Sequence, residues 1–283
     1  MMEAIADFAA RKKADAKRRL KHGTLTARER YEEDHPYGSE EQLKAKVQKL
    51  RVPTPDTQAD VPYDIYNCPG EPPEGYPYAW NVRRVLENWD PDNTDMPASI
   101  HQGLCVFDWN SDYQKAETYR KREVPFVIQN APEVMKASLR WMSDGYLDDL
   151  LGDELIRNEH SQNNQFMYWK TVHPRPDYKP PTEMITMTYA DWHRHALELD
   201  RMSSEEQVSQ EHWYFRLNGS FENHHELYEE LPFFDPSLGT SMTMIDPAQH
   251  RGINCRYGQR GITAEAHFDS SSNFIALMGG QRR

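Results

Sequence analysis

The sequence of 283 residues has few cysteines, few glycines and no long apolar run. Its three cysteines, Cys68, Cys105 and Cys255, are odd in number and widely spaced, which matches neither a disulfide scaffold nor a zinc knuckle. We therefore expect reduced thiols in a cytosol-like compartment. The 14 glycines exclude a glycine-rich fibre. Because no run of about 18 apolar residues occurs, no membrane-spanning segment is predicted, and we expect a soluble protein.

Targeting signals are also missing from the beginning of the sequence. Residues 1–20 lack the apolar stretch of a secretory signal peptide, and their acidic side chains argue against a mitochondrial presequence. The expected location is therefore the cytoplasm or the nucleus. Aromatic residues, by contrast, are plentiful: 7 Trp, 15 Tyr and 10 Phe predict an aromatic-rich core.

Charge divides the sequence into two unequal parts. Residues 1–51 carry 13 Lys or Arg and 9 Asp or Glu, whereas residues 52–283 carry 20 and 36. The acidic part repels nucleic-acid phosphates, and the basic part lacks interleaved aromatic residues, so a nucleic-acid partner is unlikely. The basic run between Arg11 and Lys21 is most simply a solvated helix face, with nuclear targeting or a partner contact as alternatives.

Three regions follow from these patterns. Residues 1–51 form a basic helical arm of two surface helices that we expect to be loosely attached, the second one opening with a capping box at Ser39 and Gln42. Residues 52–77 are rich in proline, which predicts an extended linker outside any core. Residues 78–283 contain the remaining helices and strands.

Within the third region, helical patterns come early and strand patterns late. The run VPFVIQ at 124–129 predicts a buried strand, and Asn130 with Glu133 is expected to cap the helix that begins near Pro132. After an interruption at Gly145, a short helix should end at Gly152. Further expected elements are strands at 166–172, 212–217 and 262–277 and a helix capped by Thr188 with Asp191. This order favours an α+β fold over alternating βαβ units.

Most of the 12 histidines have an unremarkable interpretation. The pairs His193 with His195 and His224 with His225 diverge at their spacing, so they are predicted to be surface or hydrogen-bonded core histidines. His267 and Asp269 differ, because residues two apart on a strand share one face. An imidazole and a carboxylate so placed supply two corners of the facial triad that binds ferrous iron. Each residue alone also fits a satisfied core histidine or an aspartate that caps a turn.

The residues around this pair resemble a known family. The stretch ITAEAHFDSSSNFIALMGGQRR at 262–283 is similar to the iron-binding strand and following strands of JmjC-type, cupin-like 2-oxoglutarate oxygenases, nearest to the branch of the asparaginyl hydroxylases. Weaker similarity extends through EVPFVIQNAPEVMKASLRWMSDGYLDDLLGD at 123–153, NNQFMYWK at 163–170 and HWYFRL at 212–217. In all, the resemblance covers residues 76–283.

The resemblance implies a role for five residues. His267 and Asp269 would be iron ligands, and Arg282 would pair with the distal carboxylate of 2-oxoglutarate, where the family more often has lysine. Asn273 would contact the cosubstrate or the iron site, and Tyr214 would hydrogen-bond the same distal carboxylate. The implied cofactor is Fe(II), the cosubstrate is 2-oxoglutarate, and the substrate would be a protein or peptide.

The family pattern also has a second histidine on a later strand, and this sequence ends at Arg283 without one. Upstream, nothing in the spacing of His160, His212 or His250 recommends it as a substitute. We therefore expect an incomplete double-stranded β-helix (cupin or jelly-roll) barrel with N-terminal helices, and a partial oxygenase that turns over poorly by itself. Its strand at 274–278 would lack neighbours and favour association. The alternative is a non-catalytic, cupin-derived module that binds partner proteins.

Overall fold

The computed structural model describes most of the chain after residue 24. The described residues are 25–50, 61–77, 103–167, 180–220, 226–235, 252–265 and 272–280, with Arg83, Glu87, Asp177, His224, His267 and Asp269. The helix expected within residues 1–20 lies outside them. In the described parts of the chain, no helix is long and apolar enough to cross a membrane.

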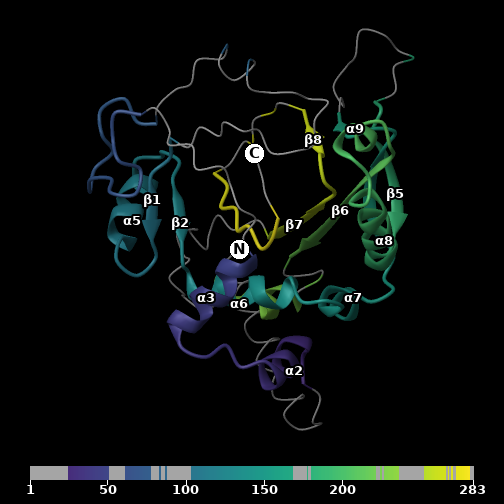
Figure 1. The fold of residues 1–283 in the computed structure, drawn as a ribbon, viewed down its shortest axis with the longest axis horizontal. Helices are drawn as coiled ribbons and strands as arrows, with labels where there is room; N and C mark the ends of the chain where they lie inside the picture. Colours follow the sequence, from purple (N-terminus) through teal and green to yellow (C-terminus); the bar gives the residue numbers. More distant parts are fainter. Residues whose placement is uncertain are drawn as a thin grey trace.

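Helices and strands are mixed, as the sequence predicts for an α+β fold (Figure 1). The helices are α2 (Ala27–Asp34), α3 (Glu40–Leu50), α5 (Tyr113–Lys121), α6 (Pro132–Trp141), α7 (Tyr146–Leu151), α8 (Tyr189–Leu199), α9 (Ser204–Gln207), α10 (Glu226–Glu230) and the 3-10 turn η1 (Pro232–Phe234). The strands are β1 (Val106–Asp108), β2 (Val127–Gln129), β3 (Ile156–Ser161), β4 (Gln165–Phe166), β5 (Glu183–Met187), β6 (His212–Gly219), β7 (Ile253–Gly258) and β8 (Thr263–Ala264).

The largest sheet has four strands in the order β5-β3-β6-β7, and every neighbouring pair is antiparallel. Two smaller sheets pair β1 with β2 and β4 with β8, both in parallel. Figure 1 shows α8 and α9 beside the large sheet, with α3, α6 and α7 beneath it. The described strands form these three separate sheets and do not close a barrel.

One face of the large sheet is the centre of the core. Phe215 and Leu217 on β6 alternate with polar neighbours, and Cys255 and Tyr257 on β7 do the same, so all four side chains are buried on one side. Trp192 of α8 covers this side, and its indole N–H donates to the carbonyl of Trp213 at 3.0 Å. The core is rich in aromatic residues, which confirms that prediction.

The N-terminal helices are packed on the body, which corrects the expectation of a loosely attached arm for residues 25–50. Leu43 and Val47 are buried on one side of α3, against Met135 of α6. The expected capping box is present: the Ser39 amide donates to Gln42 Oε1 at 2.9 Å, and the Gln42 amide donates to Ser39 Oγ at 3.3 Å. The apolar stripe of α3 has a partner stripe on α6, a long-range match that local patterns do not reveal.

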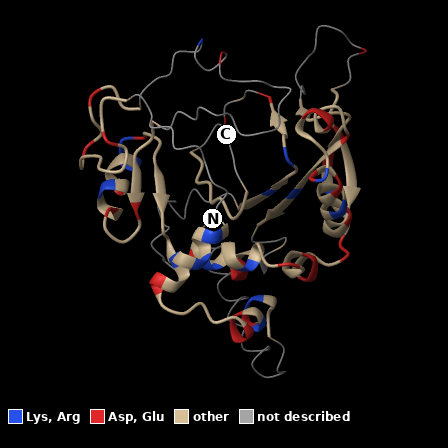
Figure 2. Cartoon of the chain, viewed as in Figure 1, with Lys and Arg blue, Asp and Glu red and all other residues tan. Residues whose placement is uncertain are grey.

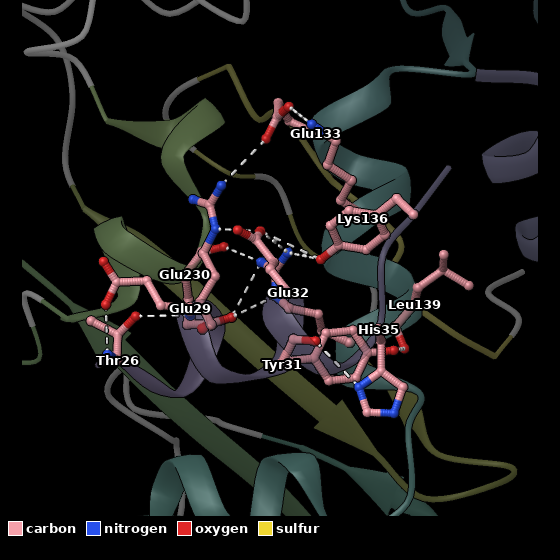
Figure 3. Close-up of polar contacts among 12 residues, drawn as sticks. Thr26, Glu29, Tyr31, Glu32, His35, Glu133, Lys136, Leu139 and Glu230 are labelled. Carbon is pink, nitrogen blue, oxygen red and sulfur yellow. Dashed lines mark hydrogen bonds and ion pairs between the residues drawn. The ribbon is translucent and has the colours of Figure 1, made fainter. Parts of the chain in front are cut away.

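A buried ion pair between Arg140 and Glu230 joins the helices to one another, and Figure 3 labels Glu230. Arg140 of α6 is 1% exposed, and its Nη2 lies 3.3 Å from the Glu230 carboxylate at the end of α10. The Trp141 indole and the Tyr146 hydroxyl also donate to Glu230, and Arg140 Nη1 donates to the Tyr37 hydroxyl at 2.8 Å. Burial and the Glu230 carboxylate raise the pKa of Tyr146. Because buried charges are tolerated only when paired and hydrogen-bonded, this network fixes how α6, α7 and α10 meet.

The α2 helix contacts residues next to this network. Arg28 donates to the Glu229 carbonyl at 3.0 Å, and the Tyr31 hydroxyl lies 2.9 Å from Ser143 Oγ. The Tyr31 hydroxyl also lies 3.4 Å from the Leu139 carbonyl of α6 (Figure 3). At the start of the helix, Thr26 and Glu29 cap each other's backbone amides. The chain from α2 to α3 is thus held against α6 by polar as well as apolar contacts.

Residues 61–77 are irregular, as their prolines predict, but they do contribute to a core. Cys68 forms a disulfide with Cys105, with 6.0 Å between their Cα atoms, and Ile65 is buried beside it. The Val106 amide of β1 donates to the Ile65 carbonyl at 2.8 Å, which draws the two segments together. Two expectations are therefore wrong, that this segment lies outside any core and that these cysteines are reduced. The partners are 37 residues apart, a separation from which pairing cannot be inferred.

Other local predictions have mixed outcomes. Thr188 does cap α8 by accepting from the Asp191 amide, and α7 runs from after Gly145 to Gly152, as expected. The Asn130–Glu133 cap is wrong, because Ala131 is the N-cap residue of α6 and makes no side-chain cap bond. Asn130 instead has φ 63° and donates its side-chain amide to Asp108 at 2.7 Å.

The thiols give a direct test of this fold. Burial raises the pKa of Cys255 to about 12, so the native, unreduced protein should not react with a thiol reagent at about pH 8. In denaturant without reductant one thiol should react, and after reduction all three should. The Cys255→Ser variant should show none before reduction. Three reactive thiols in the unreduced, denatured protein would show that Cys68 and Cys105 are not bonded.

Candidate functional site

The predicted iron-binding pair lies just beyond the end of a strand. β8 pairs with β4 over Thr263 and Ala264, and the Glu265 amide makes one further bond, to the Phe166 carbonyl at 3.0 Å. His267 and Asp269 follow without strand structure, so the expectation that a strand carries them is wrong. A strand requires a neighbour that pairs with its backbone, and the described residues supply none past Glu265.

Outside a sheet, the two side chains still come together. His267 Nε2 lies 3.9 Å from Asp269 Oδ1, and the Asn273 side-chain amide donates to the other carboxylate oxygen of Asp269. His267 Nδ1 lies 2.7 Å from the Glu265 carbonyl, which can only accept, so Nδ1 carries a proton and donates it. In the neutral ring, Nε2 then has a free lone pair directed to the same side as Asp269.

This arrangement fits two ligands of a metal ion. Metal bonds to histidine nitrogen and carboxylate oxygen are about 2.0–2.2 Å long, so neighbouring ligand atoms on one ion lie about 3 Å apart. The 3.9 Å between His267 Nε2 and Asp269 Oδ1 would therefore have to shorten if these exposed side chains bound an ion together. A ligating histidine commonly donates its other N–H to a backbone carbonyl, as His267 does to Glu265. Both side chains are 56% exposed, which leaves room for water on the open side.

A third protein ligand is not part of the arrangement. In the part of the chain that the structure describes, no group of three or more His, Cys, Asp or Glu residues is placed to hold a metal. The described residues therefore offer two ligands for a divalent ion and do not supply the complete facial triad.

Of the three upstream histidines considered, the two that the structure describes, His160 and His212, do not fill the gap. His212 is fully buried on β6, with Nδ1 2.9 Å from the Gln210 carbonyl and Nε2 3.3 Å from the Arg260 carbonyl. His160 Nε2 lies 3.8 Å from Glu211, and its ring packs against Trp213. His250 lies outside the described residues. His193 and His195 contact different elements, Asp148 of α7 and Trp213 of β6, as their helical spacing predicts.

The predicted cosubstrate contacts are separate from one another in the structure. Asn273 is engaged with Asp269, whereas Tyr214 lies on β6, where its ring meets Phe166 edge-on at 5.8 Å. Phe166 pairs with Ala264, so Tyr214 is one strand away from β8, and no interaction among the described residues joins it to His267. Arg282 falls outside the described residues. The roles assigned to Tyr214, Asn273 and Arg282 stay predictions.

The large sheet has two charged features that the sequence does not predict. Glu159 of β3 has a side chain only 2% exposed and forms an ion pair with Arg216 of β6. Arg216 is directly opposite Arg256 of β7. The alternation of polar and apolar residues in β6 could have placed Arg216 on the face opposite the main core, but only the strand register shows what it faces.

Comparison of the chain with family models, with curated proteins and with solved structures found no match. The resemblance to the JmjC-type, cupin-like oxygenases therefore stays a prediction that stands on the residues quoted for it.

Burial of His212 predicts a pH dependence of stability. Burial lowers the pKa of His212 in the folded protein by more than its two carbonyl contacts raise it. Below about pH 6.5 the unfolded chain therefore binds a proton at this residue that the folded chain does not. The free energy of unfolding should then fall with pH from about 6.5 downward, until the folded residue is itself protonated.

Urea unfolding from about pH 7.5 to 5.5 measures this effect. His212→Asn retains a donor near the position of Nδ1 and cannot titrate, so the stability advantage of the wild type over this variant should shrink as the pH falls. A wild-type advantage that is constant or grows at low pH would contradict the account.

Proposed function

We propose that this chain carries the iron-binding segment of an Fe(II)- and 2-oxoglutarate-dependent oxygenase of the JmjC, cupin-like kind, with a protein or peptide as substrate. The observation that carries the proposal is the convergence of His267, Asp269 and Asn273 after β8. These are the residues at which the sequence resembles the iron-binding segment of that family. The closeness of the two side chains and the hydrogen bond on His267 Nδ1 support it.

Each of the three residues has a distinct task in this proposal. His267 and Asp269 would hold the ion, which when bound supplies oxygen activation coupled to decarboxylation of 2-oxoglutarate. The Glu265 carbonyl fixes the tautomer of His267, and the Asn273 amide holds the Asp269 carboxylate in position. Tyr214 and Arg282 would bind the distal carboxylate of the cosubstrate.

Two protein ligands hold an ion less firmly than three. His267 and Asp269 are also more than half exposed, so water competes for the ion and weakens its binding further. We therefore propose weak metal binding and poor turnover for residues 1–283 alone.

A second candidate function is a non-catalytic module that binds a partner protein. Residues 272–280 alternate in exposure: Phe274, Ala276 and Met278 pack on the core, while Ile275 and Leu277 are 60% and 55% exposed. No backbone–backbone hydrogen bond joins this segment to the other described residues. A segment with these properties can pair with a strand of another protein, which favours this reading.

Titration with Co(II), an air-stable substitute for Fe(II), tests whether His267 and Asp269 bind a metal ion. The wild type should bind one ion, with an absorption change, and His267→Ala or Asp269→Asn should weaken binding about ten-fold or more. His193→Ala is the matched control. It removes an exposed histidine from another His–Asp pair, with 3.2 Å between His193 Nδ1 and Asp148 Oδ2, and it should leave binding unchanged.

Equal binding by the wild type and all three variants would show that His267 and Asp269 are not ligands. A folded wild type that binds no Co(II) would favour the partner-binding module instead. Succinate formation adds a separate check, because rapid turnover of 2-oxoglutarate by residues 1–283 would contradict the account of two-point binding.

A further inference from the structure

Two arginines face each other across neighbouring strands of the large sheet. Arg216 of β6 and Arg256 of β7 are paired in the strand register, so their side chains leave the same face with Cβ atoms about 5 Å apart. Figure 2 shows basic positions on these two strands. Their face is the one opposite the core, because Phe215 and Tyr257, the neighbours of the two arginines in sequence, point inward. Like charges directly opposite each other destabilise a sheet, so the pairing needs a compensating charge.

Glu159 supplies only part of that compensation. It lies on β3, on the other side of β6 from β7, and it forms an ion pair with Arg216. In the register it is opposite Tyr214, one position diagonal from Arg216 and a full strand further from Arg256. Among the described residues, Glu159 thus forms its ion pair with Arg216, and Arg256 lies on the far side of Arg216 from this carboxylate.

Arg256 has unused donors. Its Nη1 atom makes two hydrogen bonds, to Asn218 Oδ1 at 3.2 Å and to the Cys255 carbonyl at 3.3 Å. Within the described residues, Nε and Nη2 of Arg256 have no protein partner. Arg256 is exposed to solvent at the surface of the sheet. Partial burial and the charge of Arg216 lower the pKa of Arg256, which shows that the surroundings disfavour its positive charge. An anion beside Arg256 would relieve this.

We propose that Arg256 and Arg216 form a binding site for a small oxyanion, a carboxylate or a phosphate, on the face of the β5-β3-β6-β7 sheet that is opposite the main core. Guanidinium groups match both anions with two parallel hydrogen bonds, and the free Nε and Nη2 of Arg256 form such a fork. The Asn218 side chain, held by Arg256 Nη1, borders the site. This site does not depend on His267 and Asp269, the proposed metal ligands, which lie after β8.

Calorimetric titration with inorganic phosphate and with succinate tests the proposal and distinguishes the two anions. The wild type should show saturable binding of at least one of them, at one site. Arg256→Gln should weaken that binding about ten-fold or more, because it removes both charge-assisted bonds. Arg256→Lys retains the charge without the fork, so it should bind with intermediate affinity. Arg216 is left unchanged, because its loss would leave buried Glu159 without its ion pair.

The control is Arg122→Gln, which makes the same change of charge at an exposed arginine paired with Glu71. It should bind the anion as the wild type does. In anion-free buffer, Arg256→Gln should unfold at a temperature no lower than that of the wild type, because it removes one of two positive charges that face each other and repel. Absence of saturable binding of both anions would overturn the proposal. So would equal losses of affinity in Arg256→Gln and Arg122→Gln.

Discussion

The buried ion pair between Arg140 and Glu230 is the interaction on which the arrangement of helices depends. It brings together α6 and α10 directly, and through Tyr37 and Tyr146 it reaches the segment before α3 and the start of α7. Taking two charges out of water is costly, and removing one partner of such a pair costs about 3–5 kcal/mol. That is a large part of the stability of a typical folded protein, about 5–15 kcal/mol. The pair therefore allows few other arrangements of these helices.

The same helix connects this network to the sheet and to the candidate site. Trp141, next to Arg140, donates to Glu230 and stacks on Tyr257 of β7 at 5.9 Å between ring centroids. One turn earlier, the Ser138 hydroxyl donates to the Met278 carbonyl and so positions residues 272–280, which include Asn273. Phe274 in that segment packs against the core beside Phe234. The position of Asn273, and through it the Asp269 carboxylate, thus follows from contacts made by α6.

Features that depend on neighbours in sequence could be predicted, and features that depend on distant partners could not. The caps at Ser39 and Thr188, the end of α7 at Gly152 and the strand at 212–217 follow from local residue patterns, and the structure has all of them. The Cys68–Cys105 bond joins segments 37 residues apart, so spacing could not reveal it. The opposition of Arg216 and Arg256 depends on strand register, which residue types alone do not fix.

The candidate metal site combines a feature that could be predicted from neighbours in sequence with one that depends on a distant strand. The closeness of His267 and Asp269 was predicted from the sequence, but the strand expected to carry them is not present, because pairing with β4 stops after Glu265. The two side chains nevertheless lie close together, with Asn273 donating a hydrogen bond to the carboxylate. Two residues that are close in sequence can thus meet without the secondary structure that suggested it.

A double-mutant cycle at the ion pair measures how much the packing of the helices depends on it. Urea unfolding would compare the wild type with Arg140→Met, Glu230→Leu and the variant with both changes. We expect each single change to cost about 3–5 kcal/mol and the double change to cost clearly less than the sum, because no unpaired charge stays buried. Additive losses, or single losses within about 0.5 kcal/mol of zero, would contradict this expectation.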